Sequence, residues 1–301
     1  MQNFGNGDGE NCQFVGSNGQ NTPKNREIRA FDEQNDAICG DDFAARRLPV
    51  AVVDSGVGGI SVLRELRRVM PYEDFLYLGD SANAPYGSRD RGEVLDIMRR
   101  NLQMLLARGI KALVIACNTA TSAAAATLRA EYPNLPIVGI EPAIKPATLV
   151  CDSPRVLVMA TPLTLREEKF RALAERFADR EEIIPLPCCG LVELIESGDL
   201  DGAAIHQYLR DLLAPFADQK IDAVVLGCTH YPHVRHLIGQ YAPRGAVILD
   251  GGEGTAKETL RRLTAANLCA PCEREGRVEI LNSSNDPRLI TLSHTLLERE
   301  F

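Results

Sequence analysis

Two cysteines could form one chemical site, because each ends a short apolar run and precedes a polar turn. The segments IKALVIAC, ending at Cys117, and IDAVVLGC, ending at Cys228, align along their length at a separation of 228 − 117 = 111 residues. A second pair, LPVAVVD ending at Asp54 and PRVLVMA ending at Ala160, is separated by 160 − 54 = 106 residues. Two pairs with nearly the same offset predict a duplicated unit that supplies one thiol from each half.

Two thiols that face each other across a substrate suit proton transfer at carbon. One thiol removes a proton and the other delivers a proton to the opposite face, which inverts a stereocentre. An unperturbed thiol pKa near ~8.5 lets thiolate and thiol coexist near neutral pH. A nucleophilic mechanism usually needs a single cysteine with a histidine base, and one cysteine taken alone is more often a buried structural thiol. The pair therefore favours inversion at carbon.

Other polar groups lie beside these thiols or in similar turns. Asp54 begins the turn DSGVGG, whose backbone N–H groups at a helix start suit a phosphate or a carboxylate. The spacing fits neither a dinucleotide fingerprint nor a P-loop, and a tight turn alone would also use glycine. We interpret His230, two residues after Cys228, as an acid–base or electrostatic partner of that thiol. The loop GDSANAPYG, which contains Asp80, could line a pocket.

The elements that must position these groups are strands followed by helices. The run Ala112–Ala116 has no alternation, which is typical of a strand buried on both faces in a parallel sheet. A helix is expected from near Ser122, so that Cys117 lies at the carboxyl end of a strand, where open α/β sheets bind ligands. Further strands are expected at 48–53, 75–78, 137–140, 156–159 and 247–250 and in the run that ends at Cys228, with an edge strand at 278–281. Helices are expected at 60–69, 91–108, from 165, at 191–196, 203–216 and 289–297.

The fold class expected from this order is α/β, with two pseudo-symmetric doubly wound domains, a mainly parallel sheet in each, and the active site in the cleft between them. Residues 1–47 are rich in Asn, Gly, Gln and Asp and are predicted to be a disordered leader, with one short helix around 27–43.

Composition excludes several classes of function. The chain has 301 residues, a formal charge of −8 and no basic patch, which argues against nucleic-acid and membrane-surface partners. No apolar run reaches the ~20 residues that cross a bilayer, and the first residues lack the order of a signal peptide. Nine cysteines fit reduced thiols in the cytoplasm. No cofactor motif is found; a homodimer is compatible with the sequence, which gives no oligomeric state.

The remaining cysteines and histidines are given structural interpretations. Cys12 and Cys39 are expected to be inert, and the adjacent Cys188 and Cys189 to pack in the core. The CxxC segment Cys269–Cys272 has no second pair to complete a zinc site, so a loop is expected there. No metal is expected at His230, His233 and His236, because Pro232 disrupts the first turn of any helix that holds them.

Five segments together carry a family resemblance: DSGVGGISV, GDSANAPYG, ACNTATS, GIEPAIKPA and LGCTHYP. They resemble the glutamate racemases, a branch of the aspartate/glutamate racemase superfamily, from about Leu48 to the C-terminal helix. The resemblance implies cofactor-independent interconversion of L- and D-glutamate, which supplies D-glutamate for peptidoglycan. It also implies that residues 48–143 and 248–301 form one domain and that residues 144–247 form an inserted second domain.

The resemblance assigns roles by match of motif. Cys117 would take the proton from D-glutamate and Cys228 from L-glutamate, assisted by Asp54 and His230. Asp80 and Glu196 match acids that support the site. The substrate-binding residues implied by the match, besides Asp54, are Ser55, Tyr86, Gly87, Asn118, Thr119, Thr161 and Thr229.

The sequence departs from the family pattern in one segment that is expected to contribute to substrate binding. Where the family commonly has Thr-Val-x-Ser-x-x-Tyr, residues 164–170 read TLREEKF, so the polar Ser and Tyr are replaced. One alternative function is a racemase or lyase of the same superfamily that acts on aspartate or another small dicarboxylate. The other is a ligand-binding protein without turnover, although such a protein would have little reason to keep both thiols, Asp54 and His230.

Overall fold

The computed structural model describes residues 42–166, 182–284 and 286–299. The strands in these ranges are β1 Val50–Asp54, β2 Phe75–Gly79, β3 Ala112–Ile115, β4 Ile137–Gly139, β5 Arg155–Ala160, β6 Glu182–Pro187, β7 Ala223–Leu226, β8 Val247–Asp250 and β9 Val278–Asn282. The α-helices are α2 Asp42–Arg46, α3 Ile60–Val69, α4 Arg91–Ala107, α5 Asn118–Glu131, α6 Ile144–Ala147, α7 Pro162–Arg166, α9 Leu191–Glu196, α10 Ala203–Leu213, α11 Arg235–Tyr241, α12 Gly252–Ala265 and α13 Pro287–Glu298. Short 3₁₀ helices are η1 Ser81–Asn83, η2 Tyr86–Ser88, η3 Ala214–Phe216 and η4 Tyr231–Val234.

The strands form two parallel sheets with the same internal order. The first sheet has the order β4-β3-β1-β2-β9 and the second has the order β6-β5-β7-β8, which in reverse is β8-β7-β5-β6. Strands β1 to β4 are therefore equivalent to β5 to β8, and β9 is added parallel to β2 at the edge of the first sheet. This equivalence confirms the duplication predicted from the two aligned pairs, since it matches β3 with β7 and β1 with β5. The α/β class and the parallel sheets are likewise confirmed.

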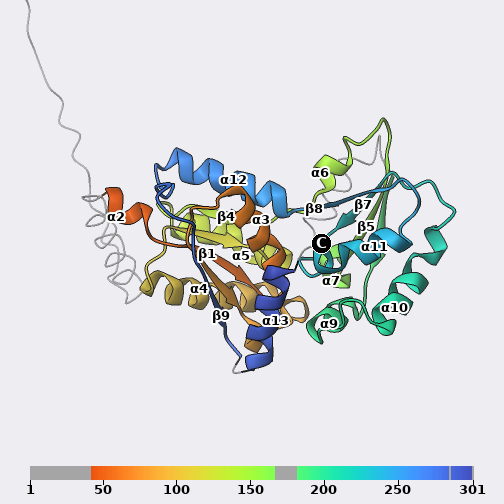
Figure 1. Ribbon diagram of the computed structural model, residues 1–301, viewed down its shortest axis with the longest axis horizontal. Coiled ribbons are helices and arrows are strands. Elements are labelled where there is room, and N and C mark those ends of the chain that lie inside the picture. The colour runs from red at the N-terminus through yellow and green to blue at the C-terminus, as the bar shows by residue number, and fades with distance from the viewer. Residues whose placement is uncertain (1–41, 167–181, 285, 300–301) are drawn as a thin grey trace, which may run out of the picture. The chain divides into compact units, whose positions relative to one another are not determined.

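Alternate residues of the buried strands supply two cores in the first sheet. Val50 and Val52 pack with α3, α12 and α13, whereas Ala51 and Val53 pack with α4 and α5. Figure 1 shows the C-terminal helices α12 and α13 beside α3, so the end of the chain returns to the first sheet. The second sheet packs α9, α10 and α11 on one face and α6 on the other. Both sheets are thus buried on their two faces, as their unbroken apolar strands predict.

Two helices begin earlier than the sequence indicated. Helix α5 begins at Asn118 rather than near Ser122, with Cys117 as its N-cap residue. The prediction followed the run of alanines, but Asn and Thr are well placed in the residues that start a helix. Helix α7 begins at Pro162 rather than Leu165, since proline is favoured at the first helical position. Helix α13 also begins at a proline, Pro287, after an Asp286 cap whose side chain accepts from the N–H of Arg288 at 2.9 Å.

Several predictions fall partly outside the described residues. The leader and its short helix, with Cys12 and Cys39, lie outside except for residues 42–47, where α2 occupies residues 42–46. Most of the altered segment 164–170 also lies outside, beyond Arg166. Across the described ranges, no helix is long and apolar enough to cross a membrane.

Candidate active site

The side chains predicted to do chemistry follow the carboxyl ends of parallel strands from both sheets. Asp54 ends β1, Asp80 follows β2 and Cys117 follows β3, while Thr161 follows β5 and Cys228 follows β7. These ends surround a cavity of about 410 Å³. The predicted residues that line it are Ser55, Tyr86, Gly87, Asn118, Thr119, Thr161, Cys228, Thr229 and His230.

Cys117 is a buried thiol with 7% of its surface exposed, and it lies next to Ser55 and Asn118, which line the cavity. Its Sγ lies 3.7 Å from the Ser55 Oγ. Burial, with the negative charge of Asp54 as the next cause, raises the pKa of Cys117 to about 12. A thiol with that pKa carries its proton at neutral pH, so in the unliganded site Cys117 is suited to deliver a proton.

Cys228 is more exposed and has a charged partner. Its Sγ lies 3.7 Å from Nδ1 of His230, whose Nε2 lies 2.9 Å from Oε1 of Glu196. Burial by itself lowers the pKa of His230, but the contacts with Cys228 and Glu196 outweigh it and raise that pKa well above its usual value. Burial likewise favours neutral Glu196, yet His230 lowers its pKa. The imidazole is therefore protonated, and a cation beside a thiol stabilises the thiolate.

Asp54 is fully buried and connects the two halves of the site. Its carboxylate accepts from the N–H of Gly56 at 3.0 Å and from Oγ1 of Thr229 at 3.1 Å. Burial raises the pKa of Asp54, and the charge of His230 and these two hydrogen bonds offset only part of that rise. Thr229 belongs to the loop after β7 in the second sheet, and Gly56 belongs to the loop after β1 in the first sheet. One carboxylate therefore fixes the two loops relative to each other.

Asp80 lies behind the cavity and reaches it through Tyr86. The Tyr86 hydroxyl donates to Asp80 at 2.6 Å, and the amides of Asn83 and Asn101 donate to the same carboxylate at 3.0 Å. Burial acts to raise the pKa of Asp80, but these hydrogen bonds and one from Ser283 outweigh it and lower that pKa. Asp80 thus remains ionised and fixes the orientation of Tyr86, which lines the cavity.

The glycines of the turn DSGVGG allow groups from the second half to approach the backbone. A Cβ added at Gly56 would lie 2.3 Å from Oε1 of Glu196, and one at Gly58 would lie 2.4 Å from Nδ1 of His230. Real Cβ atoms essentially never show such contacts. The sequence interpretation of this turn, an anion cradle or a tight turn, missed this packing, because the partners are more than a hundred residues away.

The structure also brings residues to the cavity that the sequence analysis did not select. They are Pro85, Ser88, Pro162, Thr164, Arg166, Cys188, Cys189, Gly190, Val192, Glu193 and Gly227. The prediction that both adjacent cysteines pack in the core is confirmed for Cys188, which is buried and whose Sγ donates to the carbonyl of Leu186 at 3.4 Å. The prediction is wrong for Cys189, which is exposed. Adjacent side chains at the end of a strand point to opposite sides. The sequence could therefore have predicted that one of the two thiols is buried and the other exposed.

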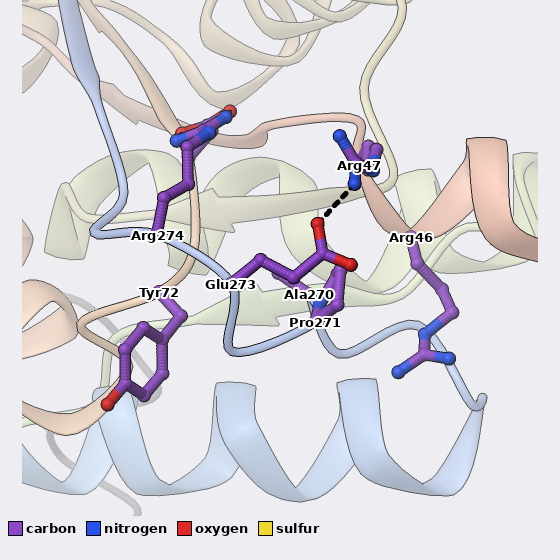
Figure 2. Close-up of a pocket in the computed structure, with 8 residues that line it drawn as sticks. Arg46, Arg47, Tyr72, Ala270, Pro271, Glu273 and Arg274 are labelled. Atoms are coloured by element: carbon purple, nitrogen blue, oxygen red, sulfur yellow. Dashed lines mark hydrogen bonds and ion pairs between the residues drawn. The ribbon is translucent and has the colours of Figure 1, made fainter.

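A second cavity, of about 230 Å³, lies at the amino ends of the first sheet and contains part of the CxxC loop (Figure 2). Its three arginines are engaged: Arg46 donates to the carbonyl of Cys269, Arg47 pairs with Glu273, and Arg274 pairs with Asp74. Ala270 and Pro271, which separate the two cysteines of the motif, line it. A loop is present there as predicted, and both thiols are free. Within the described ranges, no group of three or more His, Cys, Asp or Glu side chains could hold a metal ion.

A thiol follows each of two equivalent strands: Cys228 lines the cavity, and Cys117 lies next to Ser55 and Asn118, which line it. This arrangement is typical of a racemase site, in which protons are exchanged at two faces of a carbon. A profile of the family described as Asp/Glu/Hydantoin racemase matches residues 61–259. The chain belongs to this family.

Relatives in the family carry a narrower name. The chain is 45% identical over 253 residues to a glutamate racemase of Clostridium perfringens, which covers 84% of this chain and 97% of the relative. It is similar to the crystal structure of the glutamate racemase from Thermus thermophilus in complex with beta-chloro-D-alanine, at 36% identity and a TM-score of 0.72 over 84% of this chain and 94% of that chain. It is also similar to the Escherichia coli glutamate racemase in complex with L-glutamate and the activator UDP-MurNAc-Ala, at 28% identity and a TM-score of 0.73 over 83% and 95% of the two chains.

Proposed function

We propose that this protein interconverts L-glutamate and D-glutamate by a two-base mechanism without a cofactor, and that the D-glutamate supplies peptidoglycan synthesis in the cytoplasm. The observation that supports the proposal best is the pair of thiols at equivalent strand ends, each with a different neighbour: Ser55 beside Cys117 and His230 beside Cys228. The name of the relatives and the bound L-glutamate in the Escherichia coli protein support glutamate as the substrate.

The different neighbours of the two thiols suit one direction of the reaction. Cys228, beside a protonated His230, takes the α-proton from L-glutamate, while the thiol of Cys117 delivers a proton to the opposite face. The reverse reaction begins with Cys117 as the base and D-glutamate as the substrate. Glu196 keeps His230 charged, Asp54 holds the loop that carries Cys228, and Asp80 orients Tyr86.

Substrate binding is assigned to the polar groups that line the cavity. Asn118 and Thr119 form the first turn of α5, where backbone N–H groups and the helix dipole favour a carboxylate. The Oδ1 of Asn118 is buried without a hydrogen-bond partner among the described residues, and an ammonium group is a donor that would satisfy it. Ser55, Tyr86, Gly87, Thr161 and Thr229 complete the set, with Asp54 behind Thr229.

The function is tested with purified protein and L-glutamate in D₂O. Racemisation predicts that the optical rotation falls to zero while the α-proton signal disappears, because each inversion replaces the proton with a deuteron from solvent. Retention of both signals would overturn the proposal. L-aspartate serves as the parallel substrate, and turnover with aspartate alone would favour the second candidate, a racemase for another small dicarboxylate.

The roles of the thiols are tested by Cys117→Ser and Cys228→Ser. Each change replaces a thiol with a hydroxyl that is a far weaker acid, so net racemisation should fall by at least about 10²-fold, the lower end of the contribution of a positioned acid–base group. Circular dichroism follows the reaction in both directions, starting from L-glutamate and, separately, from D-glutamate. Cys272→Ser, at an exposed cysteine of the second cavity's loop, is the control and should keep wild-type rates. Near-normal turnover in either of the first two variants removes that thiol from the mechanism.

The proposal includes the domain organisation expected from the family. Residues 48–143 and 248–301 would form one domain and residues 144–247 an inserted second domain. The pairing of β9 with β2 supports the return of the chain to the first domain. Strand β8, which spans the proposed crossing, pairs with β7 in the second sheet.

A homodimer is proposed as the assembly, to be checked by light scattering on a gel-filtration column.

A further inference from the structure

His233 is a buried histidine that the proposed chemistry does not use. It lies in η4, three residues after His230, and none of its surface is exposed. Its Nε2 lies 3.1 Å from the carbonyl oxygen of Gly58, which is 175 residues away in the chain. A carbonyl only accepts, so Nε2 carries the hydrogen and donates it.

The residue that accepts this hydrogen bond also supports His230. Because Gly58 has no side chain, the His230 ring packs directly on it, where an added Cβ would lie 2.4 Å from Nδ1. That Nδ1 is the atom 3.7 Å from Sγ of Cys228. The position of Gly58 therefore determines how far the imidazole can move from the thiol.

A second hydrogen bond ties the same two segments together. The Ser61 hydroxyl, at the second residue of α3, lies 2.7 Å from the backbone carbonyl of Thr229 and 2.9 Å from that of Gly58, and it can donate to either. The turn that contains Gly58 and the loop that contains Cys228 are thus held by His233 from one direction and by Ser61 from the other.

We propose that His233 is a positioning residue for the Cys228–His230 pair, and that it acts by fixing the Gly58 backbone on which the His230 ring rests. This inference rests on the proposed racemase function. The imidazole suits the task because it stays neutral: burial, with the charge of His230 next, lowers the pKa of His233 to about 3. Its hydrogen bond therefore persists over the whole working range of pH. Backbone groups of Val57 and the Arg64 guanidinium are the other polar neighbours of the ring.

The test must report on one thiol at a time. Racemisation cannot do this, because the two enantiomers have equal free energy and kcat/KM must be the same in both directions. The two enantiomers of one diastereomer of 3-chloroglutamate, the threo form, avoid this constraint. A thiolate takes the α-proton, the electron pair forms a Cα=Cβ bond, and chloride leaves, so that the enamine hydrolyses to 2-oxoglutarate and ammonium. The enantiomer whose chloride release is abolished by Cys228→Ser, and not by Cys117→Ser, identifies the reaction of Cys228.

The variants form a matched pair. His233→Gln keeps an N–H donor on a chain of similar reach, while His233→Met has the same length and no donor. His233→Met should slow the Cys228-dependent release about 10- to 100-fold, as expected for a base displaced by a fraction of an ångström. It should leave the Cys117-dependent release nearly unchanged, and His233→Gln should restore most of the lost rate. His236→Met, three residues further on and partly exposed, is the control and should match wild type.

The outcomes separate the inference from the function. If His233→Met slows both chloride releases equally, or neither, the positioning role of His233 is overturned. The racemase function still stands in that case, provided that the wild-type protein racemises glutamate. Failure of the wild-type protein to racemise glutamate rejects the function itself. If His233→Met does not fold, Ser61→Ala removes the second hydrogen bond and should give the same bias toward the Cys117-dependent reaction; its absence overturns the inference.

Discussion

The carboxylate of Asp54 illustrates how a single residue serves the site at the expense of stability. It is fully buried, and that burial raises its pKa above the ordinary value of 3.8. The folded protein therefore binds the proton of Asp54 more tightly than the unfolded chain does. Between the two pKa values stability falls as pH rises, and above both of them the whole destabilisation is present. At neutral pH the charge thus opposes folding.

Asp54→Asn should consequently raise the Tm at pH 7 and lower the activity. An amide keeps an acceptor for Thr229 or for Gly56, but it removes the buried charge. The gain in Tm should shrink as pH falls toward 3.8, where the wild-type carboxyl becomes protonated in both states. Racemisation should fall more than about tenfold, as for the loss of an electrostatic partner of a catalytic group. Differential scanning calorimetry across pH and circular dichroism of turnover measure the two effects; an unchanged or lower Tm at pH 7 contradicts the argument.

Single residues also mark the limit of what the sequence reveals. The thiols and their immediate neighbours could be selected, because the repeated phrase around Cys117 and Cys228 is local in the chain. The support of Asp80 by Asn101, or of Gly58 by His233, could not, since each joins distant segments through one hydrogen bond. No pattern in a single sequence records such a bond.

At the scale of elements, the turn between β1 and α3 packs closely against residues of the second half. Gly58→Ala would place a methyl group 2.4 Å from His230 Nδ1 and 2.6 Å from Thr229 Oγ1. The His230 ring would have to move, so racemisation should fall by about 10²-fold, with a loss of about 1–3 kcal/mol in unfolding free energy from overpacking. Urea unfolding and turnover measure both.

The control for this turn is a glycine whose Cβ would meet open space. Gly254, in the first turn of α12, has no atom within 4 Å of an added Cβ. Gly254→Ala should therefore keep wild-type turnover and unfold at the same or slightly higher urea concentration, since alanine favours helix by up to about 1 kcal/mol. Equal effects at both glycines would show that the close contact with His230 is not the cause.

Helices and strands were predicted well where apolar runs are long. The predicted helix starts were less accurate where residues of the candidate active site form the start of the helix. Each expected strand is present. The central strands β1, β3 and β7 are buried along their whole length and therefore give unbroken apolar sequence, whereas β8 and β9 are mostly half-buried. The starts of α5 and α7 were misplaced, because polar residues and proline at a helix start resemble a loop. In both cases the misplaced residues lie on the cavity, among them Asn118 and Pro162.

The whole molecule combines a symmetric frame with an asymmetric site. Two sheets of the same order present two thiols, yet one thiol is buried beside Ser55 and the other has the His230–Glu196 pair. This difference fits the proposed mechanism, in which each thiol would begin the reaction with a different enantiomer. The duplication was visible in the sequence, whereas the different surroundings of the thiols depend on packing between the halves.

The site residues that the structure describes all belong to residues 43–301, which form one compact unit. A chain that begins at Asp42 retains helix α2 and the backbone carbonyl of Arg46, which accepts a hydrogen bond from the buried Lys111. We therefore expect this shortened chain to keep kcat and KM close to those of the full chain, and to keep its Tm. A chain that begins at Pro49 is the contrast: it removes one of the two acceptors of the buried Lys111 ammonium and leaves only Glu73, which should lower stability by about 1–3 kcal/mol. Parallel turnover and calorimetry on the three chains test this, and a large loss of activity in the chain that begins at Asp42 would mean that the first 41 residues take part in the reaction.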